Sequence, residues 1–144
     1  MNRHALGTPL EEFFTRYGRA WATHDPDAIV AMHTDDTVFH LHDVAEPSCG
    51  RAAVREVIAS AFEQMPDLRF ERRRVLFGAD HVVSEYVMSG SVGEKPFACD
   101  GVDVFTLRDG LVARKDSYVD WLTYARQVGL DNAKQVGLDT TGVA

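Results

Sequence analysis

The sequence predicts an α+β fold in which helices come first and a meander of antiparallel strands follows. One indication is the helical spacing of apolar residues in the first half of the chain, which is clearest over residues 54–65. The other is a change to period-2 alternation from Leu68 onward, interrupted by glycine-containing turns. Helices and strands that are segregated along a chain are typical of α+β domains. A strongly bent sheet wrapped around the helices forms a cone, and its mouth is a natural ligand pocket.

Composition limits the classes of protein to which the chain can belong. Its 144 residues fit one domain, which we place at 1–130, followed by a loosely held tail at 131–144. The net charge of −7 argues against binding to nucleic acid or to an anionic membrane surface. No apolar run approaches the roughly 20 residues that span a bilayer, and the N-terminus lacks the apolar core of a signal peptide. Cys49 and Cys99 have no metal-type spacing, so we expect a reduced, cytoplasmic location.

The predicted helices have clear start and stop signals. The first helix begins after Thr8, with Thr8 as N-cap and Pro9 in the first turn, and it ends near His24. A second, shorter helix starts at Asp25-Pro26-Asp27, and Asp35-Asp36 breaks it. Pro66 closes the third helix, and the last helix runs from Trp121 to Val128 and ends at Gly129. The apolar stripes of the first and third helices are Leu10, Phe13, Phe14, Tyr17 and Trp21, and Val54, Val57, Ile58, Ala61, Phe62 and Met65.

Five strands are predicted, one before the third helix and four after it. Residues 43–50 form a loop between the first strand and the third helix. The breaks between the later strands, such as Asp109-Gly110, suit hairpin turns. The strands run over Thr37–His42, Leu68–Phe77, His81–Ser91, Pro96–Arg108 and Leu111–Asp120.

Asp103 stands out because it interrupts an otherwise apolar strand. Alternation places it on one face with Phe105 and Leu107. A carboxylate in an apolar hollow costs free energy unless it is paired or protonated. The alternative is that Asp103 lies near a strand end on the solvated side, or pairs with Lys115 or an arginine.

The order of elements resembles the nuclear transport factor 2-like superfamily, which includes SnoaL-like polyketide cyclases, limonene epoxide hydrolase and ketosteroid isomerase. The resemblance covers about residues 8–130 and implies the cone-shaped, cystatin-like α+β barrel of that superfamily. It implies little about activity, because the fold hosts many chemistries and many non-enzymes. It is carried by the segments 24–30, Asp35-Asp36-Thr37-Val38, 50–55, 104–110, Tyr118-Val119-Asp120 and 126–129.

The most similar phrases are those of bacterial ketosteroid isomerases. The residues Glu46-Pro47 before Gly50 look like that family's loop into the third helix. The resemblance puts Tyr17 on the family's oxyanion tyrosine and Asp103 on its protonated oxyanion aspartate. That enzyme is an established example of a carboxylic acid kept neutral so that it can donate a hydrogen bond.

The family's general base is missing, because its position on the first strand is Leu41. Asp43, two residues on and on the same face by alternation, is one replacement. His40 or His42 is another if a bulge turns one inward, although simple alternation leaves both on the outer face. Steroid isomerisation by the family's mechanism is therefore not expected.

The remaining candidates concern the pocket lining. Lys115 faces inward by alternation and could pair with Asp103, which would keep that carboxylate ionised and remove it as a donor. The charged residues of limonene epoxide hydrolase fall near Tyr86, Met88 and Ser117. None of those charged residues is present here, so that comparison fails. We interpret the run containing Arg69, Arg72, Arg73 and Arg74 as a solvated outer face or dimer rim. The expected substrate-binding residues are Trp21, Phe39, Leu41, Ile58, Phe62, Tyr86, Met88, Lys115 and Ser117.

The sequence therefore predicts a cofactor-independent enzyme of the isomerase, cyclase or dehydratase type, acting on an apolar carbonyl-containing ligand. The alternative is a non-catalytic ligand-binding or dimerisation module of the same fold. We expect no cofactor and no metal, since the histidines lack ligand spacing. The resemblance also implies a homodimer formed through the outer sheet face.

Overall fold

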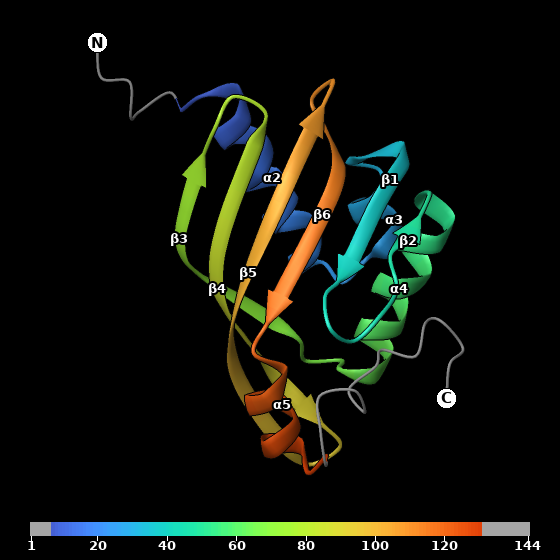
Figure 1. Cartoon of the computed structure of the whole chain (residues 1–144), viewed down its shortest axis with the longest axis vertical. Coiled ribbons are helices and arrows are strands. Elements are labelled where there is room, and N and C mark those ends of the chain that lie inside the picture. The colour runs from blue at the N-terminus through green and yellow to red at the C-terminus, as the bar shows by residue number, and fades with distance from the viewer. Residues whose placement is uncertain (1–6, 131–144) are drawn as a thin grey trace.

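The computed structural model of the chain describes residues 7–130, so the predicted tail lies outside the described residues. Within these residues, four helices and six strands follow the α+β order that the sequence predicts, with the short strand β2 in addition (Figure 1). They are α2 (Pro9–Ala22), α3 (Pro26–Val30), β1 (His33–Leu41), β2 (Ser48–Cys49), α4 (Arg51–Gln64), β3 (Arg69–Phe77), β4 (His81–Val92), β5 (Lys95–Arg108), β6 (Leu111–Val119) and α5 (Trp121–Val128).

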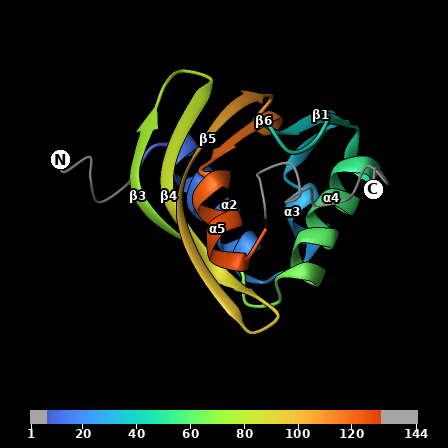
Figure 2. The ribbon, with the colours of Figure 1, turned by 60° about the horizontal axis from the view of Figure 1, so that its bottom comes forward.

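The six strands form one sheet in the order β2-β1-β6-β5-β4-β3. The β1–β6 pair is parallel and every other pair is antiparallel. The sheet is strongly curved and wraps around α2, while α4 packs near the β1 edge and α5 lies at one end (Figure 2). This is the cone that the order of elements predicts.

The helix ends follow the capping rules. The Thr8 side chain accepts a hydrogen bond from the Glu11 amide at 3.1 Å, and Pro9 occupies the first turn of α2. Gly129 ends α5 in the left-handed conformation, with a φ of 80° that a glycine adopts without strain. The predicted apolar faces are the buried ones, as Phe14 and Tyr17 of α2 and Ile58 of α4 show.

The first strand starts earlier than predicted. β1 begins at His33, whereas the sequence predicts a start at Thr37 because Asp35-Asp36 signals a break. The chain instead remains extended through the two acids, with an irregular register against β6. Both acids are exposed and paired with arginines. They interrupt the alternation of buried and exposed residues, but the strand continues through them. The loop predicted at 43–50 also contains the two-residue strand β2.

Strand β3 contains a second irregularity. It pairs with β4 so that Phe70 and Arg72 lie opposite Met88 and Tyr86, and the register then shifts between Arg72 and Arg74. A bulge of this kind adds one residue to a strand and reverses the alternation beyond it. Arg72, before the bulge, lines the inside of the cone, whereas Arg74, after it, pairs with Glu85.

Candidate functional site

A cavity of about 650 Å³ lies between α2 and the inner face of the sheet. Six aromatic side chains line it, and two charged side chains, Asp103 and Lys115, lie within it. Its exposed rim carries three arginines, Arg19, Arg69 and Arg72, which we call the arginine rim. The aromatic wall consists of Phe14, Tyr17, Trp21, Phe70, Tyr86 and Phe105.

Asp103 lies at the centre of the polar part of the cavity. The hydroxyl of Tyr86 donates a hydrogen bond to its Oδ1 at 2.8 Å, and the Nζ of Lys115 is 3.7 Å from its Oδ2. Asp103 is 7% exposed and Lys115 is 4% exposed. An ammonium has no acceptor to offer, so a carboxyl group facing Lys115 and accepting from Tyr86 fits the ionised form. These contacts realise the pairing that the sequence left open, and they do not fit a protonated, hydrogen-bond-donating Asp103.

The absence of a side chain at Gly101 of β5 makes room for the Tyr86 ring that contacts Asp103. A Cβ on Gly101, which lies opposite Tyr86 in the β4–β5 ladder, would come within 2.6 Å of the Tyr86 ring. Glycine is therefore needed for the ring to take its position over β5. Burial, followed by the nearby Asp103 charge, raises the pKa of Tyr86 well above its usual range. Tyr86 thus stays protonated and acts as a donor.

Lys115 is held among aromatic rings. Its Nζ lies 4.0 Å from the centre of the Trp21 ring, 4.6 Å from that of Phe39 and 5.7 Å from that of Phe105. Burial lowers the pKa of Lys115, and the neighbouring Asp103 opposes this effect. The ring faces and the carboxylate stabilise a cation that burial alone would disfavour.

Tyr17 is part of a buried chain of polar groups. Its hydroxyl is 2.8 Å from Nε2 of His33, and Nδ1 of His33 is 2.8 Å from the Thr37 hydroxyl. Burial, together with the charges of Lys115 and Arg51, lowers the pKa of His33 to about 3, so the imidazole is neutral. When Nε2 carries its proton, it donates to Tyr17 and leaves the tyrosine proton free to point into the cavity.

Trp21 supplies an unused donor. Its indole Nε1 is buried and is the one buried side-chain polar atom without a hydrogen-bond partner among residues 7–130. Burial raises the pKa of Tyr17 far above its usual range, and the nearby Trp21 N–H partly offsets the rise, although the two groups do not reach hydrogen-bonding geometry. A buried donor without an acceptor is costly, which favours a ligand that brings one.

The predicted substrate-binding residues divide between two cavities. Trp21, Tyr86 and Lys115 line the large one, and they also line a second cavity of about 40 Å³. Phe62 lines neither of these two cavities and instead stacks on His24 with ring centres 4.2 Å apart. The other predicted residues line the small cavity alone and act as core: Phe39, Leu41, Ile58, Met88 and Ser117.

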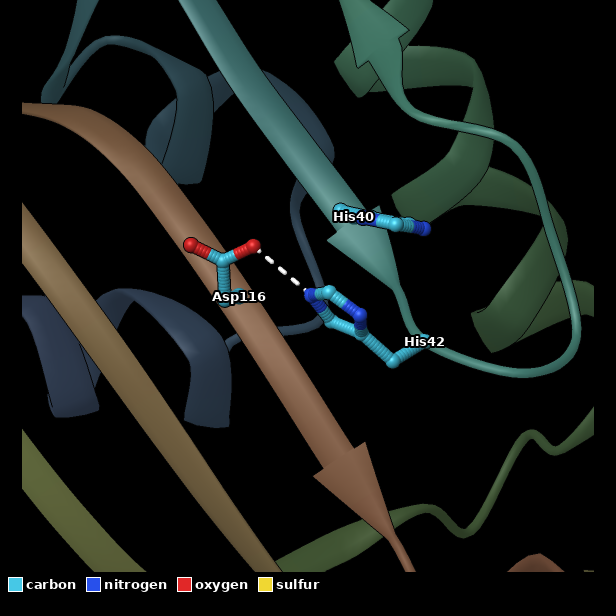
Figure 3. Close-up of side chains that lie close together, drawn as sticks. All are labelled: His40, His42 and Asp116. Atoms are coloured by element: carbon cyan, nitrogen blue, oxygen red, sulfur yellow. Dashed lines mark hydrogen bonds and ion pairs between the residues drawn. The ribbon is translucent and has the colours of Figure 1, made fainter.

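The replacements proposed for the missing base do not reach either cavity. Asp43 is exposed in the turn after β1, with a φ of 72°, so the chain has left the strand and alternation no longer applies. His40 and His42 lie on the outer face of the sheet, as Figure 3 shows, because no bulge separates them from inward-facing Leu41. Their assignment as catalytic bases is therefore wrong for a ligand inside the cone.

The two outer histidines belong to a different cluster. Nε2 of His42 lies 2.8 Å from Oδ1 of Asp116 (Figure 3), and the His40 and His42 rings are 3.7 Å apart. Arg114 binds both carboxylate oxygens of Asp116, at 2.8 and 3.0 Å. Partial burial opposes ionisation, but the hydrogen bonds from Arg114 and His42 outweigh it and lower the pKa of Asp116. His40, His42 and Asp116 are close enough to share a cation, yet Arg114 already neutralises the carboxylate.

Two features of the site were not anticipated from the sequence. Arg72 and Arg69 line the cavity, so the interpretation of the basic run as an outer face is wrong for these two residues. The other is His33, which lies before the predicted start of the strand at Thr37. Simple alternation back from Phe39 does not locate His33 reliably, because it would also turn exposed Asp35 inward and the register against β6 shifts between His33 and Val38.

The fold is that of the nuclear transport factor 2-like superfamily, and the match to a SnoaL-like family model supports membership of it. Within it, the chain belongs to the SnoaL-like family, because the SnoaL-like domain matches residues 14–115. A search of curated proteins found no match. No helix within residues 7–130 is long and apolar enough to cross a membrane.

Three solved structures illustrate the likeness. A putative SnoaL-like polyketide cyclase from Jannaschia is 20% identical, with 92% of this chain and 99% of that chain covered and a TM-score of 0.78. A hypothetical protein with a ketosteroid isomerase-like fold from Catenulispora acidiphila, in complex with trimethylamine, is 21% identical over 85% and 95%, with a TM-score of 0.77. TerC co-crystallised with polyporic acid is 18% identical over 85% and 99%, with a TM-score of 0.75. At these identities the likeness shows the fold.

Proposed function

We propose that the chain is a cofactor-independent enzyme that binds an apolar carbonyl-containing ligand in the large cavity and moves a proton next to the carbonyl group. Isomerisation, cyclisation and dehydration all begin with such a step. The observation that carries the proposal is the unpartnered Trp21 N–H, which lies beside Lys115 and near Tyr17 in an aromatic cavity. The Lys115 cation, with the Trp21 N–H and the Tyr17 hydroxyl in the same cavity, suits a ligand oxygen that becomes negatively charged.

The roles follow from charge. Asp103, as a carboxylate, removes a proton from the carbon beside the carbonyl. The electron pair of that C–H bond moves toward the carbonyl oxygen, where the Lys115 ammonium and the Trp21 and Tyr17 donors stabilise it. Asp103 thus takes the role of base that the sequence assigned to Asp43, His40 or His42, and Lys115 takes the donor role first assigned to Asp103.

The names of two structural neighbours support a ligand of this kind. One is described as a putative SnoaL-like polyketide cyclase, and polyketides are chains of carbonyl groups. TerC was co-crystallised with polyporic acid. The aromatic wall of this chain suits flat, conjugated ligands of similar character.

Deuterium exchange into model ketones tests the proposal and does not require the natural substrate. The probes are 2-tetralone and 1-indanone in D₂O, with loss of the α-proton signal followed by NMR. We expect the protein to accelerate exchange and Asp103→Asn to reduce that acceleration by about 100-fold. Asp43→Asn, in the exposed turn, is the matched control and should exchange like the parent. Full activity of Asp103→Asn would refute the assignment of the base.

A second candidate is a binding module, which is favoured by the contacts that Asp103 already makes with Tyr86 and Lys115. A carboxylate that is fully occupied orders a pocket without moving a proton. In the same samples, a module would broaden the ketone signals through binding and leave their α-protons unexchanged. A homodimer formed through the outer sheet face stays a prediction, which light scattering after size exclusion would check.

A further inference from the structure

The charge of the cavity is opposite to that of the chain. The whole protein carries a net charge of −7. The large cavity, by contrast, is lined by four basic residues, Arg19, Arg69, Arg72 and Lys115, and by one carboxylate, Asp103. Lys115 neutralises Asp103, so the positive charge that remains is that of the arginine rim. A positive opening in an acidic protein attracts anions and repels cations.

Arg72 is the best-placed member of the rim. Its Nη2 donates a hydrogen bond to the Phe14 carbonyl at 2.9 Å, and its guanidinium lies 4.1 Å from the centre of the Phe14 ring. It also lies so close to Gly18 that a Cβ there would be 2.5 Å from Nη2. The guanidinium is therefore fixed by a carbonyl, a ring and a helix backbone, with donors left over.

Arg72 also differs from its neighbours on β3. Arg73 pairs with Glu71 at 3.8 Å, and Arg74 pairs with Glu85 at 2.8 Å. Within residues 7–130, Arg72 has no carboxylate partner. Burial lowers the pKa of Arg72, which means that part of its hydration is lost without compensation by an acid. An anionic group of a ligand would supply that compensation.

We propose that the natural ligand carries an acidic group, such as a carboxylate, which Arg72 binds at the rim while the apolar body of the ligand reaches the aromatic wall. This inference rests on the proposed function and narrows its substrate class from apolar carbonyl compounds to their acids. Guanidinium binds a carboxylate through two parallel hydrogen bonds, so Arg72 also orients the ligand. The carbonyl end then points toward Asp103 and Lys115. A small amine, such as the trimethylamine bound by the Catenulispora acidiphila neighbour, does not fit this rim.

Two fluorescent probes test the proposal directly. The compounds 1-anilinonaphthalene-8-sulfonate and N-phenyl-1-naphthylamine share their rings and differ by one sulfonate. We expect the parent protein to bind the sulfonate probe about tenfold more tightly than the neutral probe, as one charge-assisted contact would give. Arg72→Met should abolish this preference, measured as the ratio of the two affinities in the same variant. The preference should also fall as salt increases.

Arg73→Met is the matched control, because it removes the same charge from the same strand at a position that does not line the cavity. It should keep the preference for the sulfonate probe. Gly18→Ala provides a second variant that retains every arginine, because its Cβ displaces the Arg72 guanidinium while alanine favours the helix. It should weaken the preference as Arg72→Met does, and a cooperative thermal transition would verify its fold.

The outcomes separate cleanly. Equal affinity of the parent for the two probes, or an unchanged preference in Arg72→Met, would overturn the inference. Loss of the preference in Arg73→Met to the same extent would assign it to general surface charge and overturn it as well. Binding is measured without turnover, so the preference for an acid can hold even if the exchange experiment on Asp103 fails. Exchange can likewise succeed with neutral ketones if Arg72 has no role.

Discussion

The two faces of the sheet each hold an aspartate and a cation, in nearly adjacent positions, yet the two pairs differ in kind. On the outer face, Arg114 forms hydrogen bonds with both carboxylate oxygens of Asp116, and His42 forms one with Oδ1. Asp103 on the inner face has one hydrogen bond from Tyr86 and a lysine at 3.7 Å, and it borders a cavity. Asp116 therefore accepts three hydrogen bonds, whereas Asp103 accepts one, faces a lysine and lies against the cavity. The comparison teaches that two aspartates on adjacent strands can differ in how many hydrogen bonds they accept, and the proposed role of Asp103 as a base depends on that difference.

The largest difference between the faces should appear in stability. Lys115→Ala leaves Asp103 buried without its cation, and we expect the free energy of unfolding in urea to fall by about 3 to 5 kcal/mol. Arg114→Ala, one residue away on the outer face, should cost about 1 kcal/mol or less. The double variant Lys115→Met/Asp103→Leu should recover much of the loss. Equal costs for the two single variants would show that burial does not separate the pairs.

The faces should also differ in activity. Tyr17→Phe removes a donor from the cavity, and we expect the rate of ketone exchange at saturation to fall by about 100-fold. His42→Gln changes the outer cluster and should leave that rate within about twofold of the parent. Rates from NMR exchange at several ketone concentrations would separate an effect on turnover from one on binding. A large loss in His42→Gln would return the outer histidines to the mechanism.

Lowering the pH should reduce the free energy of unfolding through His33 on the inner face. Its pKa is about 3 in the folded protein and near 6.5 when exposed, so the unfolded chain takes up a proton that the native chain refuses. This contribution is complete above pH 6.5, and stability falls by about 1.4 kcal/mol per pH unit below it, down to about pH 3. Urea unfolding at pH 7, 6 and 5 should show this slope in the parent and lose it in His33→Gln. An unchanged slope in that variant would contradict the burial of a neutral imidazole.

The smallest expected effect belongs to Asp116. Its folded pKa is lowered below the ordinary value of 3.8, so its stabilising contribution is present above that value and is lost as pH falls through the folded pKa. We expect Asp116→Asn to be less stable than the parent by about 1 kcal/mol at pH 7, with the gap closing below pH 3.8. Urea unfolding of both proteins from pH 7 to 3 measures the gap. A gap that persists at the acid end would assign the effect to packing.

Much of the fold could be predicted because local chemistry and global architecture agree. The cap at Thr8, the apolar stripe of α4 and the Asp109-Gly110 turn each signal a boundary that the structure keeps. Alternation alone placed Asp103 and Lys115 on the inner face. The polar network could not be predicted in full, because a pair of inward-facing charges says nothing about which hydrogen bonds each oxygen accepts. The orphan N–H of Trp21 depends on rotamers and neighbours that no spacing encodes.

The errors lie in two strands, β1 and β3. The acids after His33 predict a break where the chain stays extended, and β3 contains a bulge that simple alternation does not include. A missed bulge assigns every residue beyond it to the wrong face. Arg72 precedes the bulge and shares its face with Phe70, so the error there comes from grouping the arginines by charge, although Arg72 lines the cavity.

That bulge has an evolutionary consequence. Phe70 and Arg72 face inward before it, and Val75 pairs opposite inward-facing Ser84 after it, with Arg73 and Arg74 between them. Deleting either intervening arginine would straighten the strand and leave the facing of the residues on both sides unchanged. Deleting a residue elsewhere in β3 would exchange the inner and outer faces of the residues beyond the gap. Strand β3 can therefore change its length at one place, and homologous chains that differ by a single residue here should carry the difference at the bulge.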